Sequence, residues 1–130
     1  MATPAEILPY LYLGSRLCAE DRQLLSEHGI THVLNAASEI PNYHEGTADA
    51  PSYLHLELND AAEDDLVGVF GRCFPFVDSA RDAGGKVLVH CQAGISRSAA
   101  IVIAYLMSSR SMTLRDAFFL VKERRGSNGP

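Results

Sequence analysis

The chain is poor in cysteine, in long apolar runs and in positive charge, and each shortage narrows the range of functions. Its three cysteines, Cys18, Cys73 and Cys91, have no metal-ligand spacing, and residues 1–30 contain no basic segment followed by an apolar run. We therefore expect reduced thiols in a cytosolic or nuclear protein, not a disulfide framework. The longest strongly apolar run, Ala99–Met107, is too short to span a bilayer.

The charge balance is acidic, with a formal net charge of -5 at pH 7. This balance argues against general affinity for nucleic acid or for an anionic membrane, because both attract basic proteins. It is compatible with a small, local anion site. With 130 residues, of which 47% are hydrophobic and 21% charged, the chain suits one globular domain over 1–130.

Apolar periodicity along the chain predicts strands that alternate with helices. The predicted strands cover 7–8, 11–13, 30–36, 53–58 and 86–90, and the predicted helices cover 17–28, roughly 64–83, 98–110 and a last segment from Thr113. Pro75 should kink or split the second helix, and Thr113-x-x-Asp116 resembles a capping box. The alternation predicts an α/β fold: a central, mostly parallel β-sheet flanked by α-helices on both sides.

One segment, VHCQAGISRS at 89–98, lies between a predicted buried strand and a predicted buried helix. Ligands of open α/β sheets bind where strands end and helices begin. A loop that leads into a helix N-terminus points backbone N–H groups outward, and the helix dipole favours an anion there. Gly94 allows such a loop to curl around a small anion. We therefore predict a phosphate-binding loop made of Cys91, Gln92, Ala93, Gly94, Ile95, Ser96 and Arg97.

Four side chains of this segment have groups suited to phosphate chemistry. The planar guanidinium of Arg97 can grip two phosphate oxygens at once. Helix N-termini and nearby cations lower the pKa of cysteine thiols, so we expect a Cys91 thiolate to attack phosphorus. Ser98 can donate a hydrogen bond to that thiolate or to its phosphorylated form, and His90 can brace the loop. The alternatives are a structural buried thiol at Cys91 and an ordinary core histidine at His90.

The pattern His-Cys-x5-Arg-Ser resembles the signature loop of the protein tyrosine phosphatase superfamily. More narrowly, VHCQAGISRSA followed by AYLM resembles the dual-specificity phosphatases, including the MAP-kinase phosphatase branch. The resemblance extends to GITHVLNAAS at 29–38 and YLHLELNDAAEDDL at 53–66. It implies a protein tyrosine phosphatase-like fold and a single catalytic domain with its core at about residues 5–125.

The resemblance also implies two further site residues. It places a general acid at Asp60, where a carboxylic acid would protonate the leaving oxygen; Asp64 and Asp65 are rivals that better suit the first turn of the next helix. It places Asn35 at the end of a strand, where the amide would brace the phosphate loop by hydrogen bonds. An ordinary turn amide is the alternative interpretation of Asn35.

The function implied is a protein phosphatase that acts through a phosphocysteine, without a metal or other cofactor. A compact chain should form a shallow pocket that accepts phosphotyrosine, phosphoserine and phosphothreonine. The implied partners are phosphoproteins, MAP kinases among them, with no nucleic acid and no membrane, and the oligomeric state is left open. Two alternatives remain: a phosphoinositide or nucleic-acid 5′-phosphatase, and a non-catalytic phosphoprotein-binding module. Uncharged side chains at Gln92 and Ile95 disfavour the first, and Cys91 itself disfavours the second.

Overall fold

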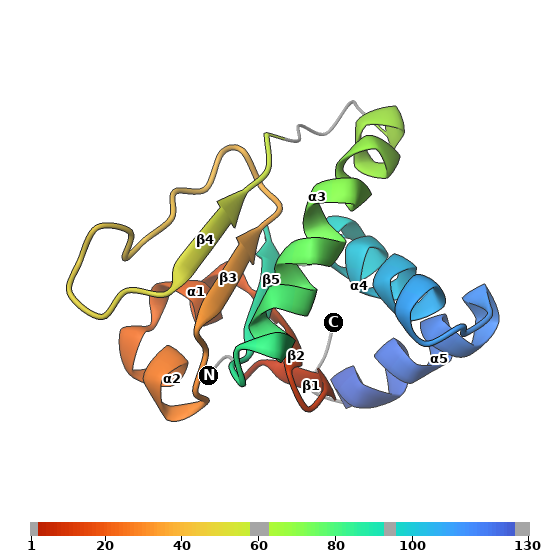
Figure 1. Ribbon diagram of the computed structural model, residues 1–130, viewed down its shortest axis with the longest axis horizontal. Coiled ribbons are helices and arrows are strands. Elements are labelled where there is room, and N and C mark those ends of the chain that lie inside the picture. Colours follow the sequence, from red (N-terminus) through yellow and green to blue (C-terminus); the bar gives the residue numbers. More distant parts are fainter. Residues whose placement is uncertain (1–2, 58–62, 93–95, 127–130) are drawn as a thin grey trace.

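A computed structural model describes residues 3–57, 63–92 and 96–126, and for residues 63–67 and Ser96 only the backbone is described (Figure 1). Its strands are β1 (Ala5–Leu8), β2 (Leu11–Ser15), β3 (His32–Asn35), β4 (Ser52–His55) and β5 (Val87–Cys91). Its helices are α1 (Arg16–Glu20), α2 (Arg22–Glu27), α3 (Glu63–Asp82), α4 (Ser96–Ser109) and α5 (Leu114–Arg125).

The five strands form one sheet in the order β1-β2-β5-β3-β4. β1 pairs with β2 in the antiparallel direction, whereas β2, β5, β3 and β4 are parallel to their neighbours. The predicted mostly parallel α/β sheet is therefore confirmed. β5 lies in the middle of the sheet, and all of its residues are buried, as a strand covered on both faces should be.

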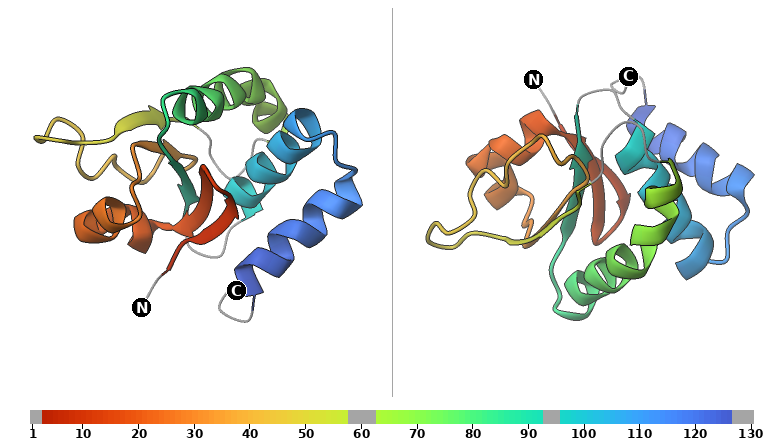
Figure 2. Two further views of the ribbon diagram at one scale, coloured as in Figure 1. Left: turned by 60° about the horizontal axis from the view of Figure 1, so that its bottom comes forward. Right: turned by 90° about the horizontal axis from the view of Figure 1, so that it is seen from above.

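Helices cover both faces of the sheet, and alternate strand residues pack against each layer (Figure 2). On one face, Val33 and Leu88 belong to a small hydrophobic cluster with residues of α1 and α2. On the other face, Leu34 and Val89 belong to a larger cluster with residues of α3, α4 and α5. The period of two along each strand thus separates two cores that share one sheet.

The segment predicted as one helix over 17–28 consists of two helices, so that prediction is wrong at Asp21. This residue has an extended backbone, with φ of -87° and ψ of 98°, and its carboxylate accepts a hydrogen bond from the N–H of Leu24 at 3.1 Å. Asp21 therefore ends α1 and caps the N-terminus of α2. Aspartate gains this capping bond only by leaving the helical conformation, which explains the break.

Pro75 does not split α3, which continues as a helix to Asp82. Cys73 and Val77 lie on either side of the proline, and both are buried in the larger core. Their packing holds the chain helical across the missing N–H group. At the start of α5, Thr113 accepts a hydrogen bond from the N–H of Asp116 at 3.1 Å, which confirms the predicted N-cap.

Three strands bring their carboxyl ends to the same edge of the sheet. Ser15 of β2 is paired with Cys91 of β5, and Asn35 of β3 is paired with His90 of β5. The segments that follow β3 and β5 therefore begin side by side, which is where a parallel α/β sheet binds ligands. Among the helices within the described ranges, none is long and apolar enough to cross a membrane.

Candidate active site

Cys91 ends β5 and is almost fully buried, with 2% of its surface exposed. Its sulfur lies 3.0 Å from the hydroxyl oxygen of Ser98, which is in the first turn of α4 and is 4% exposed. The sulfur also lies 3.4 Å from the backbone oxygen of Gln92, to which a thiol can donate. The strand end and the helix start thus place a sulfur and a hydroxyl in direct contact, as the sequence pattern predicts.

His90 lies between two neighbouring strands and is 1% exposed. Burial, together with the nearby His55, lowers the pKa of His90 to about 4 although a hydrogen bond with the backbone of Cys91 acts in the opposite direction. The imidazole is therefore neutral at physiological pH. The carbonyl oxygen of His90 accepts a hydrogen bond from the N–H of Ala36 at 2.8 Å, so its backbone ties β5 to the segment after β3. Both features suit a structural brace next to Cys91.

Arg97 lies in the first turn of α4, and its side chain is 11% exposed. One terminal nitrogen, Nη2, lies 3.2 Å from Oε2 of Glu39, which follows β3. The side chain of Arg97 is therefore largely buried, and its guanidinium is tied to the segment that follows β3. The sequence pattern predicts Arg97 as a phosphate-binding residue but contains no signal for Glu39, because the two residues are 58 positions apart.

Asn35 ends β3 and is fully buried, but its side chain does not make the contacts expected from the sequence. Nδ2 donates to the backbone oxygen of Ile40 at 2.7 Å and to Oδ1 of Asn42 at 3.1 Å. Oδ1 accepts from the N–H of Ala37 at 3.0 Å. Both amide hydrogens are therefore used by the turn that follows β3. We correct the expectation that Asn35 donates to the phosphate loop: it braces the turn that contains Glu39.

Several predicted site residues lie outside the described part of the chain. These are the predicted general acid Asp60 and three members of the predicted phosphate loop, Ala93, Gly94 and Ile95. For Ser96 the structure describes only the backbone, at the start of α4. The rivals Asp64 and Asp65 fall in the first turn of α3, as the sequence predicts. Gln92, the first residue after Cys91, is exposed.

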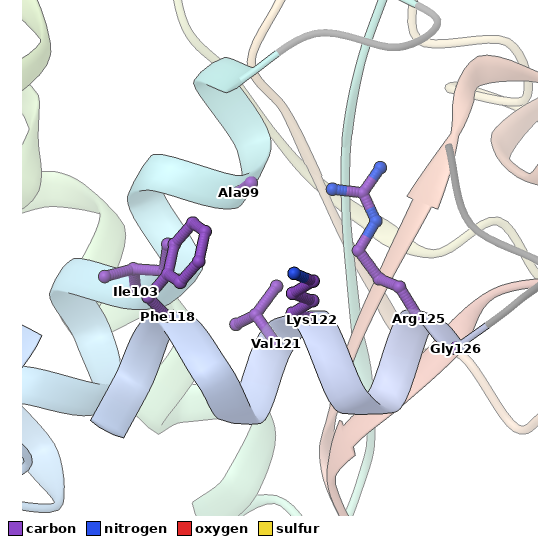
Figure 3. A pocket seen from close by; sticks show the side chains of 7 residues that line it. All are labelled: Ala99, Ile103, Phe118, Val121, Lys122, Arg125 and Gly126. Atoms are coloured by element: carbon purple, nitrogen blue, oxygen red, sulfur yellow. The ribbon is translucent and has the colours of Figure 1, made fainter. Parts of the chain in front are cut away.

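A cavity of about 340 Å³ lies between α4 and α5 (Figure 3). It is lined by Ala99, Ile103, Phe118, Val121, Lys122, Arg125 and Gly126. Ala99 directly follows Ser98, so the cavity begins next to the residue that contacts Cys91. Lys122 and Arg125, near the end of α5, both border this cavity.

The family model and the relatives that match this chain all belong to one family of proteins. A family model described as "Dual specificity phosphatase, catalytic domain" matches residues 11–130. Dual specificity protein phosphatase 2 of Mus musculus is 46% identical over 127 residues, which are 98% of this chain and 39% of that protein. Dual specificity protein phosphatase 1 of Homo sapiens is 43% identical, over 98% of this chain and 34% of that protein. The chain thus spans less than half the length of these relatives.

Solved structures agree with the sequence comparison. The human tyrosine phosphatase-like serine/threonine/tyrosine-interacting protein superposes with a TM-score of 0.83 at 40% identity, covering 94% of this chain and 83% of that chain. Human DUSP28 superposes with a TM-score of 0.83 at 31% identity, covering 94% of this chain and 80% of that chain. Both share the α/β architecture described above.

Proposed function

Because the chain belongs to the dual specificity phosphatase family, we propose that it hydrolyses phosphotyrosine, phosphoserine and phosphothreonine in proteins through a phosphocysteine on Cys91. One observation carries the mechanism: the Cys91 sulfur lies 3.0 Å from the Ser98 hydroxyl, where a central strand ends and a buried helix begins. This is a position where backbone N–H groups and the helix dipole favour an anion.

The proposed cycle has two displacements at phosphorus. In the first, the Cys91 thiolate forms a bond to phosphorus as the ester oxygen leaves, and the carboxylic acid of Asp60 gives that oxygen a proton. In the second, the Asp60 carboxylate takes a proton from water, the water oxygen bonds to phosphorus, and the sulfur leaves as a thiolate. Arg97 holds phosphoryl oxygens in both steps, which is mainly a matter of position and charge.

Each described residue has one task in this cycle. The Ser98 hydroxyl donates to the sulfur, and it stabilises the thiolate each time this anion is regenerated. The neutral, buried His90 supports the strand end on which Cys91 lies. We propose phosphoproteins of the cytosol or nucleus as substrates, MAP kinases among them. The resemblance of the signature segment to the MAP-kinase phosphatase branch supports the last point.

The test compares kcat/KM for phosphotyrosine peptides, phosphothreonine peptides and a phosphoinositide, with wild-type protein and with Cys91→Ser. We expect turnover of both peptides above that of the phosphoinositide, and no turnover by Cys91→Ser, which should still bind the phosphopeptides. Turnover by Cys91→Ser would refute the nucleophile. A preference for the phosphoinositide would favour a lipid phosphatase, and binding without turnover by the wild-type protein would indicate a phosphoprotein-binding module.

A further inference from the structure

The ion pair between Arg97 and Glu39 joins two segments that follow neighbouring parallel strands. Arg97 Nη2 and Glu39 Oε2 are 3.2 Å apart, and the two side chains are 11% and 46% exposed. The Glu39 side chain is therefore about half exposed to solvent, while most of the Arg97 side chain is enclosed by protein. Because solvent reaches the Glu39 carboxylate and screens the pair, the pair contributes little to folding. The effect that matters here is the one on the position of the Arg97 guanidinium.

The turn that carries Glu39 is fixed by side chains beneath it. Asn35 bonds to three groups of the turn, as described above, and it is fully buried. In addition, Nε2 of His55 in β4 lies 2.9 Å from the backbone oxygen of Ala37. Two strands thus hold both the start and the middle of the 36–42 segment. Glu39 is presented from a rigid support and is not a side chain on a loose loop.

The geometry of a guanidinium explains why such a support matters. Arginine has five N–H donors in one plane, so a carboxylate at one nitrogen leaves further donors for phosphate oxygens. Arginine also has a long side chain with many rotamers, and fixing it before the substrate arrives removes an entropic cost from the reaction. The carboxylate is ionised in neutral solution, because the backbone N–H of Glu39 and the Arg97 guanidinium together lower its pKa below the ordinary value.

We propose that Glu39 is a positioning residue that orients the Arg97 guanidinium for phosphoryl oxygens before the substrate binds. This inference rests on the proposed phosphatase function and adds to it a residue outside the Cys-x5-Arg segment. A rival role would be competition, in which the Glu39 carboxylate occupies Arg97 and must be displaced by phosphate. The two roles predict opposite effects: removal of the carboxylate weakens oxyanion binding if Glu39 positions Arg97, and strengthens it if Glu39 competes.

The experiment uses Glu39→Gln and Glu39→Ala, with Glu45→Gln as the matched control. Glu45 lies in the same loop, is exposed and is paired with Asn42, not with Arg97. Turnover of p-nitrophenyl phosphate gives kcat and KM, calorimetry gives the affinity for orthovanadate, and thermal unfolding gives Tm. We expect Glu39→Ala to lower kcat/KM and vanadate affinity about tenfold or more, with Tm and the control unchanged, since small misplacements of a catalytic group are costly.

A double-mutant cycle with Arg97→Lys tests whether the effect passes through Arg97. In the Arg97→Lys background, Glu39→Ala should change vanadate affinity much less than in the wild-type background. Unchanged or increased vanadate affinity in Glu39→Ala would overturn the proposal, as would an equal loss in Glu45→Gln or in the Arg97→Lys background. The vanadate measurement does not need turnover. A wild-type protein that binds vanadate but fails to hydrolyse esters would refute the proposed function while still deciding the role of Glu39.

Discussion

The hydroxyl oxygen of Ser98 and the sulfur of Cys91 are 3.0 Å apart, and both residues are almost fully buried. They are seven positions apart in sequence, at opposite ends of the predicted phosphate loop. A hydroxyl in this position can donate to an anionic sulfur that little water reaches. Hydrogen bonds to charged groups contribute about 1.5–3 kcal/mol, more than bonds between neutral groups.

Replacing Ser98 by Ala should slow the second step of the cycle more than the first. The sulfur becomes an anion when phosphocysteine is hydrolysed, so loss of the hydrogen bond should slow that step most. We expect kcat for p-nitrophenyl phosphate to fall about tenfold or more, with an initial burst of p-nitrophenol in stopped-flow measurements. Ser108→Ala, an exposed position on α4, is the control and should match the wild-type protein. An unchanged kcat in Ser98→Ala would contradict this role.

Replacing Asp60 by Asn should affect substrates according to their leaving groups. An alkyl phosphate leaves as a strong base that needs a proton, so kcat should fall by about 10²–10⁴. An aryl ester with an acidic phenol leaves without that proton, so its first step should change little. Asp64→Asn and Asp65→Asn, in the first turn of α3, are matched controls and should leave both substrates nearly unaffected. Equal losses on the two substrates would argue against Asp60 as the acid.

The buried His90 should make folding stability depend on pH. Its pKa is lowered to about 4 in the folded protein, whereas a histidine in an unfolded chain titrates at about 6.5. Between these values the unfolded chain binds the additional proton, so acid favours unfolding. The stabilisation is complete above about pH 6.5 and is lost as the pH falls toward 4. Between pH 7.5 and pH 5, we expect the free energy of unfolding to decrease by about 2 kcal/mol from this residue.

Chemical denaturation of the wild-type protein and of His90→Asn at both pH values checks this prediction. The variant should lose less stability on acidification, with a residual slope from groups such as His32, whose pKa burial also lowers. NMR titration of the wild-type imidazole gives an independent measurement. A His90 signal that titrates near pH 6.5 in the folded protein would contradict the prediction, whatever the variant does.

The sequence predicts most of those parts of the fold that are determined by residues close together in the chain. Strands appear where apolar residues alternate or run continuously, and the Thr113 cap follows from residues three positions apart. One predicted helix is wrong although the cause of the difference is also local. The apolar pattern over 17–28 continues across Asp21, yet the capping bond to Leu24 breaks the helix there. In α3, the helix runs through Pro75, so of the two effects predicted for this proline, a kink or a split, the split does not occur.

The candidate site also has contacts that the local sequence predicts and contacts that it does not. Cys91 and Ser98 belong to one short segment, so their contact follows from a strand, a loop and a helix in sequence. Glu39 comes from another strand's turn, and no spacing rule links it to Arg97 across 58 positions. For Asn35, the sequence leaves two roles open, and the structure supports the turn amide, because asparagine often bonds to the backbone a few residues ahead.

The sheet order has a consequence for how the molecule is made. β5, which carries Cys91, is the last strand in the sequence, yet it lies between β2 and β3. A growing polypeptide therefore emerges with β2 and β3 unable to complete their ladders until residue 91 has been synthesised. Unpaired edges of this kind invite pairing with other chains, so we expect the nascent chain to expose two such edges until β5 is in place. The pairing that closes the sheet also fixes the backbone of Cys91, so we expect activity only in chains in which β5 is in place.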